Sequence, residues 1–80
     1  MSDATEQLAR VVRLVVDDAD AVEVTEVPDG RVTVLELRVA EEDLGKVIGR
    51  QGRTARAFRS LLGARGAREG RRYELQVLDD

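Results

Sequence analysis

Residues 45–54, GKVIGRQGRT, are the stretch of this chain that decides its fold. Gly49 and Gly52 stand three positions apart and enclose the polar pair Arg50 and Gln51. Because glycine has no Cβ atom, a loop built on it can come close to another backbone, including a sugar-phosphate backbone. The Val-Ile pair before the loop and the Arg-Thr pair after it indicate that one short helix ends here and a second begins. We therefore predict a tight loop between two helices.

The residues around this loop favour a phosphate ligand. Lys46, Arg50 and Arg53 supply positive charge, and Arg56 would extend it along the second helix. The amides that open this helix, near Gly52, attract anions, since the N-terminus of a helix carries partial positive charge. The Gly-x-x-Gly spacing by itself is common at corners between helices, so the prediction depends on the charges that surround it.

The net charge of −3 is unevenly distributed along the chain. Residues 1–44 contain 4 basic and 12 acidic side chains, whereas residues 45–72 contain 9 basic and 1 acidic. Such asymmetry is typical of a local anion-binding surface on an acidic body. A salt-bridged surface without a ligand is the alternative explanation.

The residues before the loop predict one helix and two strands. The helix should begin at Asp3, with Glu6 completing a capping box, and should fray over residues 17–20. Strands over residues 22–27 and 32–39 flank a Pro-Asp-Gly turn and should pair antiparallel, because the connection is too short for a crossover. The apolar stripe of the helix comprises Leu8, Val11, Val12, Val15 and Ala19. In the second strand one face, predicted to point into the core, comprises Thr33, Leu35, Leu37 and Val39.

The residues from 41 onward predict two helices and a last strand. The first helix starts at three carboxylates, Glu41–Asp43, and the second begins near Arg53. Gly63, Gly66 and Gly70 indicate a basic loop over residues 63–72, and a strand follows to Leu78. The arginines of that loop either make a second phosphate contact or only keep the surface soluble: Arg65, Arg68, Arg71 and Arg72. The predicted core residues of these elements are Leu44, Val47, Ile48, Ala55, Phe58, Leu61, Leu62, Tyr73, Leu75 and Val77.

The element order is therefore α-β-β-α-α-β, in a single α+β domain over residues 1–80. A helix and a strand occupy residues 4–27, and a β-α-α-β core occupies residues 31–78. Helices on one face of a small sheet would bury all of these apolar stripes.

The composition excludes several kinds of site. The chain has neither Cys nor His, which removes the usual zinc ligands and the commonest general base. The nucleotide-binding patterns GxxxxGK[ST] and GxGxxG are absent. Phe58 and Tyr73 are too few for an aromatic platform that stacks bases. We therefore expect no enzyme, metal or cofactor and, without a signal peptide or membrane span, a cytoplasmic protein.

With these elements placed, residues 44–54 resemble the signature of the K-homology (KH) family. In that family a Gly-x-x-Gly loop between two short helices clamps about four nucleotides of a single strand. The resemblance extends from about Leu8 to Leu78, and the added N-terminal helix and strand match the type II arrangement. Within that family, residues 44–54 resemble the cores of small stand-alone bacterial KH proteins of the KhpA type. The resemblance implies a mixed three-stranded sheet and cytoplasmic binding of single-stranded RNA.

The same resemblance implies biological roles. These are RNA chaperoning or post-transcriptional regulation, action as a homodimer or with a larger KH-containing partner of the KhpB (Jag) type, and control of cell shape and cell wall biogenesis. It assigns RNA binding to Gly45, Lys46, Ile48, Gly49, Arg50, Gln51, Gly52, Arg53 and Arg56. Gly45, Ile48, Ala55 and the edge formed by residues 37–39 would line a shallow groove for bases. Position 55 is Ala, where the family commonly has a branched aliphatic residue, so the base preference stays open.

A rival hypothesis is a protein-interaction or ribosome-associated module whose Arg-rich face binds an acidic partner. The residues alone also leave open whether the nucleic acid is RNA or DNA.

Overall fold

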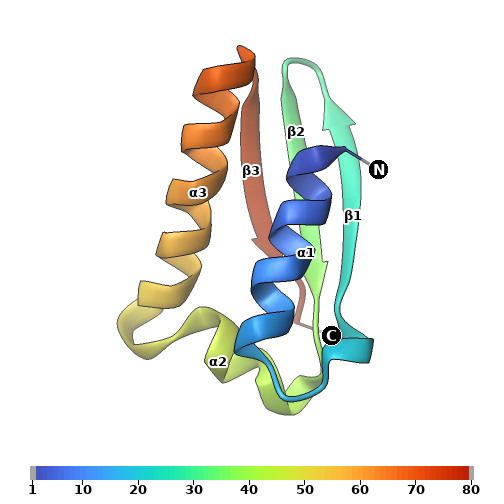
Figure 1. The fold of residues 1–80 in the computed structure, drawn as a ribbon, viewed down its shortest axis with the longest axis vertical. Coiled ribbons are helices and arrows are strands. Elements are labelled where there is room, and N and C mark those ends of the chain that lie inside the picture. Colours follow the sequence, from blue (N-terminus) through green and yellow to red (C-terminus); the bar gives the residue numbers. More distant parts are fainter. Residues whose placement is uncertain (1, 80) are drawn as a thin grey trace.

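A computed structural model describes residues 2–79 of the chain (Figure 1). The six main elements follow the predicted order, and three short 3₁₀ turns separate some of them. The helices and strands are α1 (Asp3–Val15), β1 (Glu23–Asp29), β2 (Val32–Arg38), α2 (Leu44–Ile48), α3 (Arg53–Glu69) and β3 (Arg72–Val77). The 3₁₀ turns are Ala19–Ala21, Glu41–Asp43 and Arg50–Gly52.

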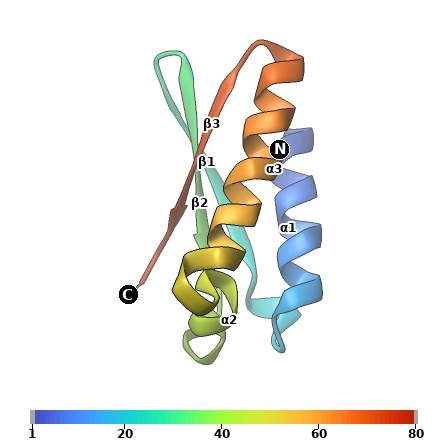
Figure 2. The same ribbon diagram turned by 90° about the vertical axis from the view of Figure 1, so that its left-hand side faces the viewer.

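The three strands form one mixed sheet in the order β1-β2-β3. Strands β1 and β2 pair antiparallel, and β2 and β3 pair parallel. The parallel pair needs a crossover, which α2 and α3 provide. Helices α1 and α3 lie side by side on one face of the sheet (Figure 2). The α+β class and the placement of helices on one face are therefore confirmed.

The core lies between the helical layer and this face of the sheet. Leu35 and Leu37 of the central strand are completely buried, as are Leu8 and Val12 of α1. Strand alternation and the helical period place these side chains toward the same layer. Further buried residues from the other elements are Val47, Ala55, Phe58, Leu62, Tyr73 and Leu75.

The start of α1 is anchored to the edge strand. Ser2, and not Asp3 as predicted, is the N-cap: its Oγ accepts a hydrogen bond of 3.2 Å from the amide of Thr5. The amide of Ser2 donates to Glu26 of β1 at 2.6 Å, and the Thr5 hydroxyl also donates to Glu26. Hydrogen bonds from the Ser2 and Thr5 side chains lower the pKa of Glu26 to about 2.

Two element boundaries differ from the prediction. Helix α1 ends at Val15, so Ala19 lies in a 3₁₀ turn instead of extending the helical stripe. Pro28 and Asp29, predicted as part of a turn, belong to β1, and only residues 30–31 connect the two strands. Pro28 is tolerated because β1 is an edge strand. On the outer side of such a strand no neighbour needs a backbone N–H donor, so its absence costs no hydrogen bond between strands.

The predicted basic loop over residues 63–72 is wrong. Helix α3 continues to Glu69, with Gly63 and Gly66 in its interior. Gly66 is buried, and its carbonyl accepts a hydrogen bond of 2.8 Å from the amide of Arg71. A Cβ atom at Gly66 would lie 2.4 Å from the carbonyl oxygen of Arg71. Gly66 thus allows the chain leaving α3 to pass tightly against the helix as it enters β3.

Candidate nucleic-acid interface

Helices α2 and α3 meet in the predicted corner, at one end of the molecule (Figure 1). Helix α2 ends at Ile48, and Gly49, its C-cap, has a φ of 77°. In the turn that follows, Gln51 has a φ of 58° and Gly52 a φ of 73°. Glycine adopts such left-handed angles freely, whereas glutamine does so less readily. The run of positive φ angles makes the sharp change of direction from α2 into α3.

Gly49 is also fixed by a close approach of the backbone. A Cβ atom there would lie 2.3 Å from Oγ1 and 2.7 Å from the amide nitrogen of Thr54. A Cβ atom at Gly52 would meet nothing within 4 Å. The first glycine therefore brings the loop against the first turn of α3, while the second keeps the outer surface of the loop free of a side chain.

The charged residues of the corner are on its surface. Arg50, Gln51 and Arg53 are exposed, and so is Arg56. Nη2 of Arg56 donates a hydrogen bond of 3.2 Å to the carbonyl oxygen of Gln51. Arg56 was predicted as a phosphate contact, and in the structure it also braces the loop. The corner thus presents positive charge around a backbone turn with little side-chain bulk.

Lys46 lies on α2 but is not a free cation. Its Nζ forms an ion pair with Asp17 and lies 3.6 Å from Oδ1 of Asp43. The hydrogen bond to Asp17 is the main cause of the raised pKa of Lys46. Lys46 therefore joins α2 to the segment that follows α1, and any contact with a phosphate would compete with these carboxylates.

Asp43 is a structural residue that the sequence interpretation missed. Its side chain is completely buried, and the two carboxylate oxygens accept hydrogen bonds from the amides of Asp17 at 3.2 Å and Asp18 at 3.0 Å. The hydrogen bond from Asp18 is the largest cause of its lowered pKa. Asp43 occupies the N-cap position of α2 yet makes no side-chain cap there. It serves instead to hold α2 against the end of α1.

Changing Asp43 to Ala should lower the melting temperature by more than about 5 °C, because two backbone amides and Lys46 lose their partner. Exposed Glu42, its neighbour, is the matched control, and Glu42→Ala should shift the melt by less than about 2 °C. Since the folded-state pKa of Asp43 is lowered, its stabilising effect is present above the ordinary value of 3.8 and is lost as pH falls below it. Thermal melts at pH 7 and pH 3 check both points. Equal losses in the two variants at pH 7 would contradict the assigned role.

The residues predicted to line a groove beside the loop do not all lie where a groove would need them. Ile48 is 44% exposed, so its prediction as a core residue is wrong, and it lies on the surface of α2 near exposed Gly45. Ala55 is only 4% exposed and belongs to the core, where it cannot line a groove. A shallow hollow of about 220 Å³ does lie between α2 and the ends of β2 and β3. Its lining residues are Arg38, Val39, Glu41, Leu44 and Leu78.

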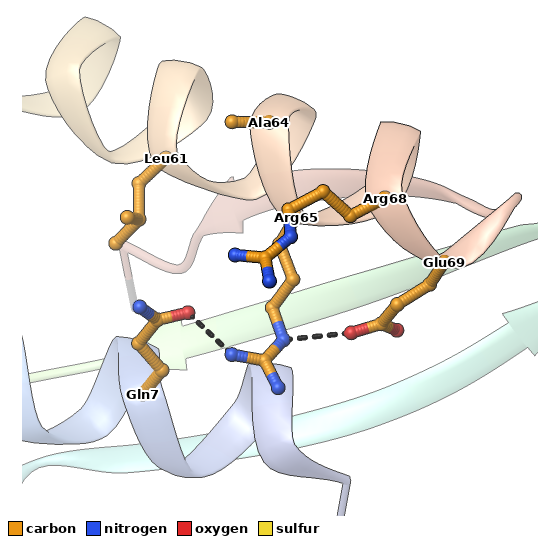
Figure 3. Close-up of a pocket in the computed structure, with 6 residues that line it drawn as sticks. All are labelled: Gln7, Leu61, Ala64, Arg65, Arg68 and Glu69. Atoms are coloured by element: carbon orange, nitrogen blue, oxygen red, sulfur yellow. Dashed lines mark hydrogen bonds and ion pairs between the residues drawn. The ribbon is translucent and has the colours of Figure 1, made fainter.

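Arg65 was one of the four arginines predicted to lie in the basic loop over residues 63–72. It is held by other side chains, so it is neither a free phosphate contact nor a side chain that only keeps the surface soluble. Its side chain extends from α3 toward α1 along a pocket between the helices (Figure 3). Nη1 donates to Oε1 of Gln7 at 2.9 Å, and Nε donates to Oε2 of Glu69 at 2.8 Å. Nη2 lies 3.5 Å from Oδ2 of Asp3. Arg65 thus joins the two helices, while Arg68 flanks the same pocket and is exposed.

None of the helices within residues 2–79 has the length and apolar character that a membrane span requires. No three side chains of the metal-binding types gather into a possible metal site within the same residues.

The α-β-β-α-α-β order, the mixed sheet and the glycine corner between α2 and α3 together define a type II KH domain. The chain belongs to the family described as KhpA/KhpB, KH domain, whose profile matches residues 5–77.

Curated relatives support this assignment. The chain is 50% identical over 74 residues to a protein of Streptomyces coelicolor, and the aligned region covers 92% of each of the two chains. It is 48% identical over 69 residues to one from Borreliella burgdorferi, covering 86% of this chain and 84% of the relative. A relative from Aquifex aeolicus is 50% identical over 64 residues, covering 80% and 81%. Each of the three is named RNA-binding protein KhpA. No solved structure matches the chain.

Proposed function

We propose that this chain binds single-stranded RNA, with the backbone of the strand lying against the Gly49–Gly52 loop. The observation that carries the proposal is the corner itself, where Arg50, Arg53 and Arg56 surround a turn with little side-chain bulk. Relatives that share about half of its residues are named as RNA-binding proteins. The loop holds the backbone, Gly45 and Ile48 offer an open, partly apolar surface to bases, and Lys46 contributes charge when a phosphate displaces its carboxylate partners. The proposal is one of binding alone and does not include cleavage or modification of the RNA.

Titration of a labelled single-stranded RNA, followed by fluorescence anisotropy at several salt concentrations, tests this function. Neutralising about three or four phosphates predicts a plot of log affinity against log salt with a slope near −2 to −3. Single-stranded DNA of the same sequence, and the RNA as a duplex, show which nucleic acid is preferred. Absence of RNA binding at 50 mM salt, or binding that is independent of salt, would support the rival protein-interaction module.

We further propose that the chain acts in pairs, as a homodimer or with a larger KH-containing protein. One KH unit contacts about four nucleotides, which limits both affinity and sequence information, and joining two units raises the effective concentration of the second contact. Light scattering during size-exclusion chromatography, with and without RNA, should give a mass of two chains or more. A strictly monomeric protein that binds RNA with nanomolar affinity would contradict paired action.

The finer roles belong to the same proposal. A cytoplasmic RNA chaperone or post-transcriptional regulator would need weak, exchangeable contacts with many strands, which a backbone-gripping loop supplies. Effects on cell shape and cell wall biogenesis would then follow from the transcripts it binds. Crosslinking and sequencing of bound RNA in cells, with a loop variant as control, tests whether such transcripts are among its targets.

A further inference from the structure

We propose a second phosphate-binding site, at the end of the molecule opposite the Gly49–Gly52 loop. It is the hollow between the β1–β2 turn and the α3–β3 turn, and in it Arg31 and Arg71 hold phosphates of an RNA strand that is already bound at the loop. The inference rests on the proposed function and extends it from about four nucleotides to a longer strand.

The topology of the sheet brings the two turns together. Parallel pairing of β2 and β3 places Val32, the first residue of β2, beside Arg72, the first residue of β3. Both turns consequently lie at the upper end of the molecule in Figure 1, and α2 lies at the lower end. Between them is a hollow of about 570 Å³. Its lining residues are Pro28, Gly30, Arg31, Thr33, Gly70 and Arg71.

The charge lining this hollow is positive. Arg31 and Arg71 are both exposed, and neither forms an ion pair within 4 Å with a carboxylate of residues 2–79. Asp29 is close in sequence, but strand alternation directs its side chain to the sheet face opposite that of Pro28. The carboxylate of Glu69 accepts hydrogen bonds from Arg65 and Tyr73 at its two oxygens, and the charge of Arg71 is near enough to contribute to its lowered pKa. A phosphate in the hollow would therefore share Arg71 with Glu69. Two arginines and a glycine-rich rim, with no carboxylate in the lining itself, are the features of an anion site.

An unobstructed surface connects this hollow to the loop. On α3, exposed Arg56, Ser60, Gly63 and Ala67 follow one another at intervals of three or four residues and lead to Arg71. No acidic or bulky apolar side chain stands in this row. From Arg53 to Gly70 the helix spans roughly 25 Å at 1.5 Å per residue. At 3.4 Å or more per nucleotide, about seven nucleotides suffice to cross it.

The length of the RNA separates the two sites experimentally. Fluorescein-labelled single-stranded RNAs of 5 and 15 nucleotides are titrated with wild type and with the double variant Arg31→Glu/Arg71→Glu. The short strand reports the loop alone, and the long strand can reach both sites. A slope of −0.7 per phosphate corresponds to about fivefold in affinity per contact at 0.1 M salt. The variant should therefore bind the 15-mer about 25-fold more weakly, with a slope less steep by about 1.4, and bind the 5-mer within twofold of wild type.

The double variant Arg10→Glu/Arg13→Glu is the matched control, since both residues are exposed on α1 and the change in charge is the same. It should bind both RNAs within about threefold of wild type. If Arg31→Glu/Arg71→Glu binds the 15-mer as this control does, or loses affinity equally for both lengths, the second site is overturned. In the first case the hollow would be a surface for an acidic protein and not for RNA. The proposed function would still be supported by the binding of the 5-mer. A wild-type protein that binds neither RNA overturns the proposed function itself.

Discussion

A chain in which Arg50 and Gln51 are both changed to Asp should fold as the wild type does and lose its affinity for single-stranded RNA. Both residues are exposed, so each change should alter the free energy of unfolding by no more than about 0.5 kcal/mol. Gln51 has a φ of 58°, an angle that Asp adopts at least as readily as Gln, so the turn keeps its shape. Both glycines stay in place, and with them the close approach of Gly49 to Thr54.

The loss of affinity should be large because two negative charges would face the phosphates where the strand approaches the backbone most closely. Losing the one cationic contact, that of Arg50, corresponds to about fivefold at 0.1 M salt, and repulsion between the two new carboxylates and the phosphates adds to it. Anisotropy titrations measure the affinity, and urea melts confirm that the variant is folded. A control with the same change in charge, Arg10→Asp/Arg13→Gln on α1, should stay within about threefold of wild type. If the loop variant is folded and binds RNA as tightly as wild type, the assignment of the loop is wrong.

Features of the fold that repeat along the chain were predictable from the sequence. Alternation in β2 and β3 placed Leu35, Leu37 and Leu75 in the core, and all three are buried. The glycine corner was predictable because two glycines three positions apart and an adjoining basic segment are local signals. Each of these predictions needed only neighbouring residues and the period of the element.

The features that the sequence did not reveal depend on contacts between distant segments. Asp43 looked like one of three carboxylates at a helix start, yet its side chain turns inward to amides that lie 25 and 26 positions earlier. Lys46 looked like a free cation, but Asp17 reaches it from the end of α1. Arg65, similarly, is held by residues of α1. No local pattern distinguishes these side chains from solvent-exposed neighbours of the same type.

The glycines of α3 show how a local signal can mislead. Glycine costs about 1 kcal/mol relative to alanine inside a helix, so three glycines within eight residues favoured a loop. The helix continues because burial of Phe58 and Leu62 on its inner face offsets that cost. Gly66 is then required by the path of the chain into β3. Gly63, one turn earlier, is exposed and has open space around it.

The same substitution at these two glycines should therefore have opposite effects on stability. Gly63→Ala should raise the free energy of unfolding by about 0.5–1 kcal/mol, because alanine restricts the unfolded chain and has the higher helix propensity. Gly66→Ala gains the same propensity but places Cβ 2.4 Å from the carbonyl oxygen of Arg71, a backbone atom that can move only if α3 and β3 separate. Such overpacking costs about 1–3 kcal/mol, so the free energies of unfolding of the two variants should differ by roughly that amount. Urea unfolding followed by circular dichroism measures both values. Stabilisation by both substitutions would show that α3 and β3 do not pack this closely.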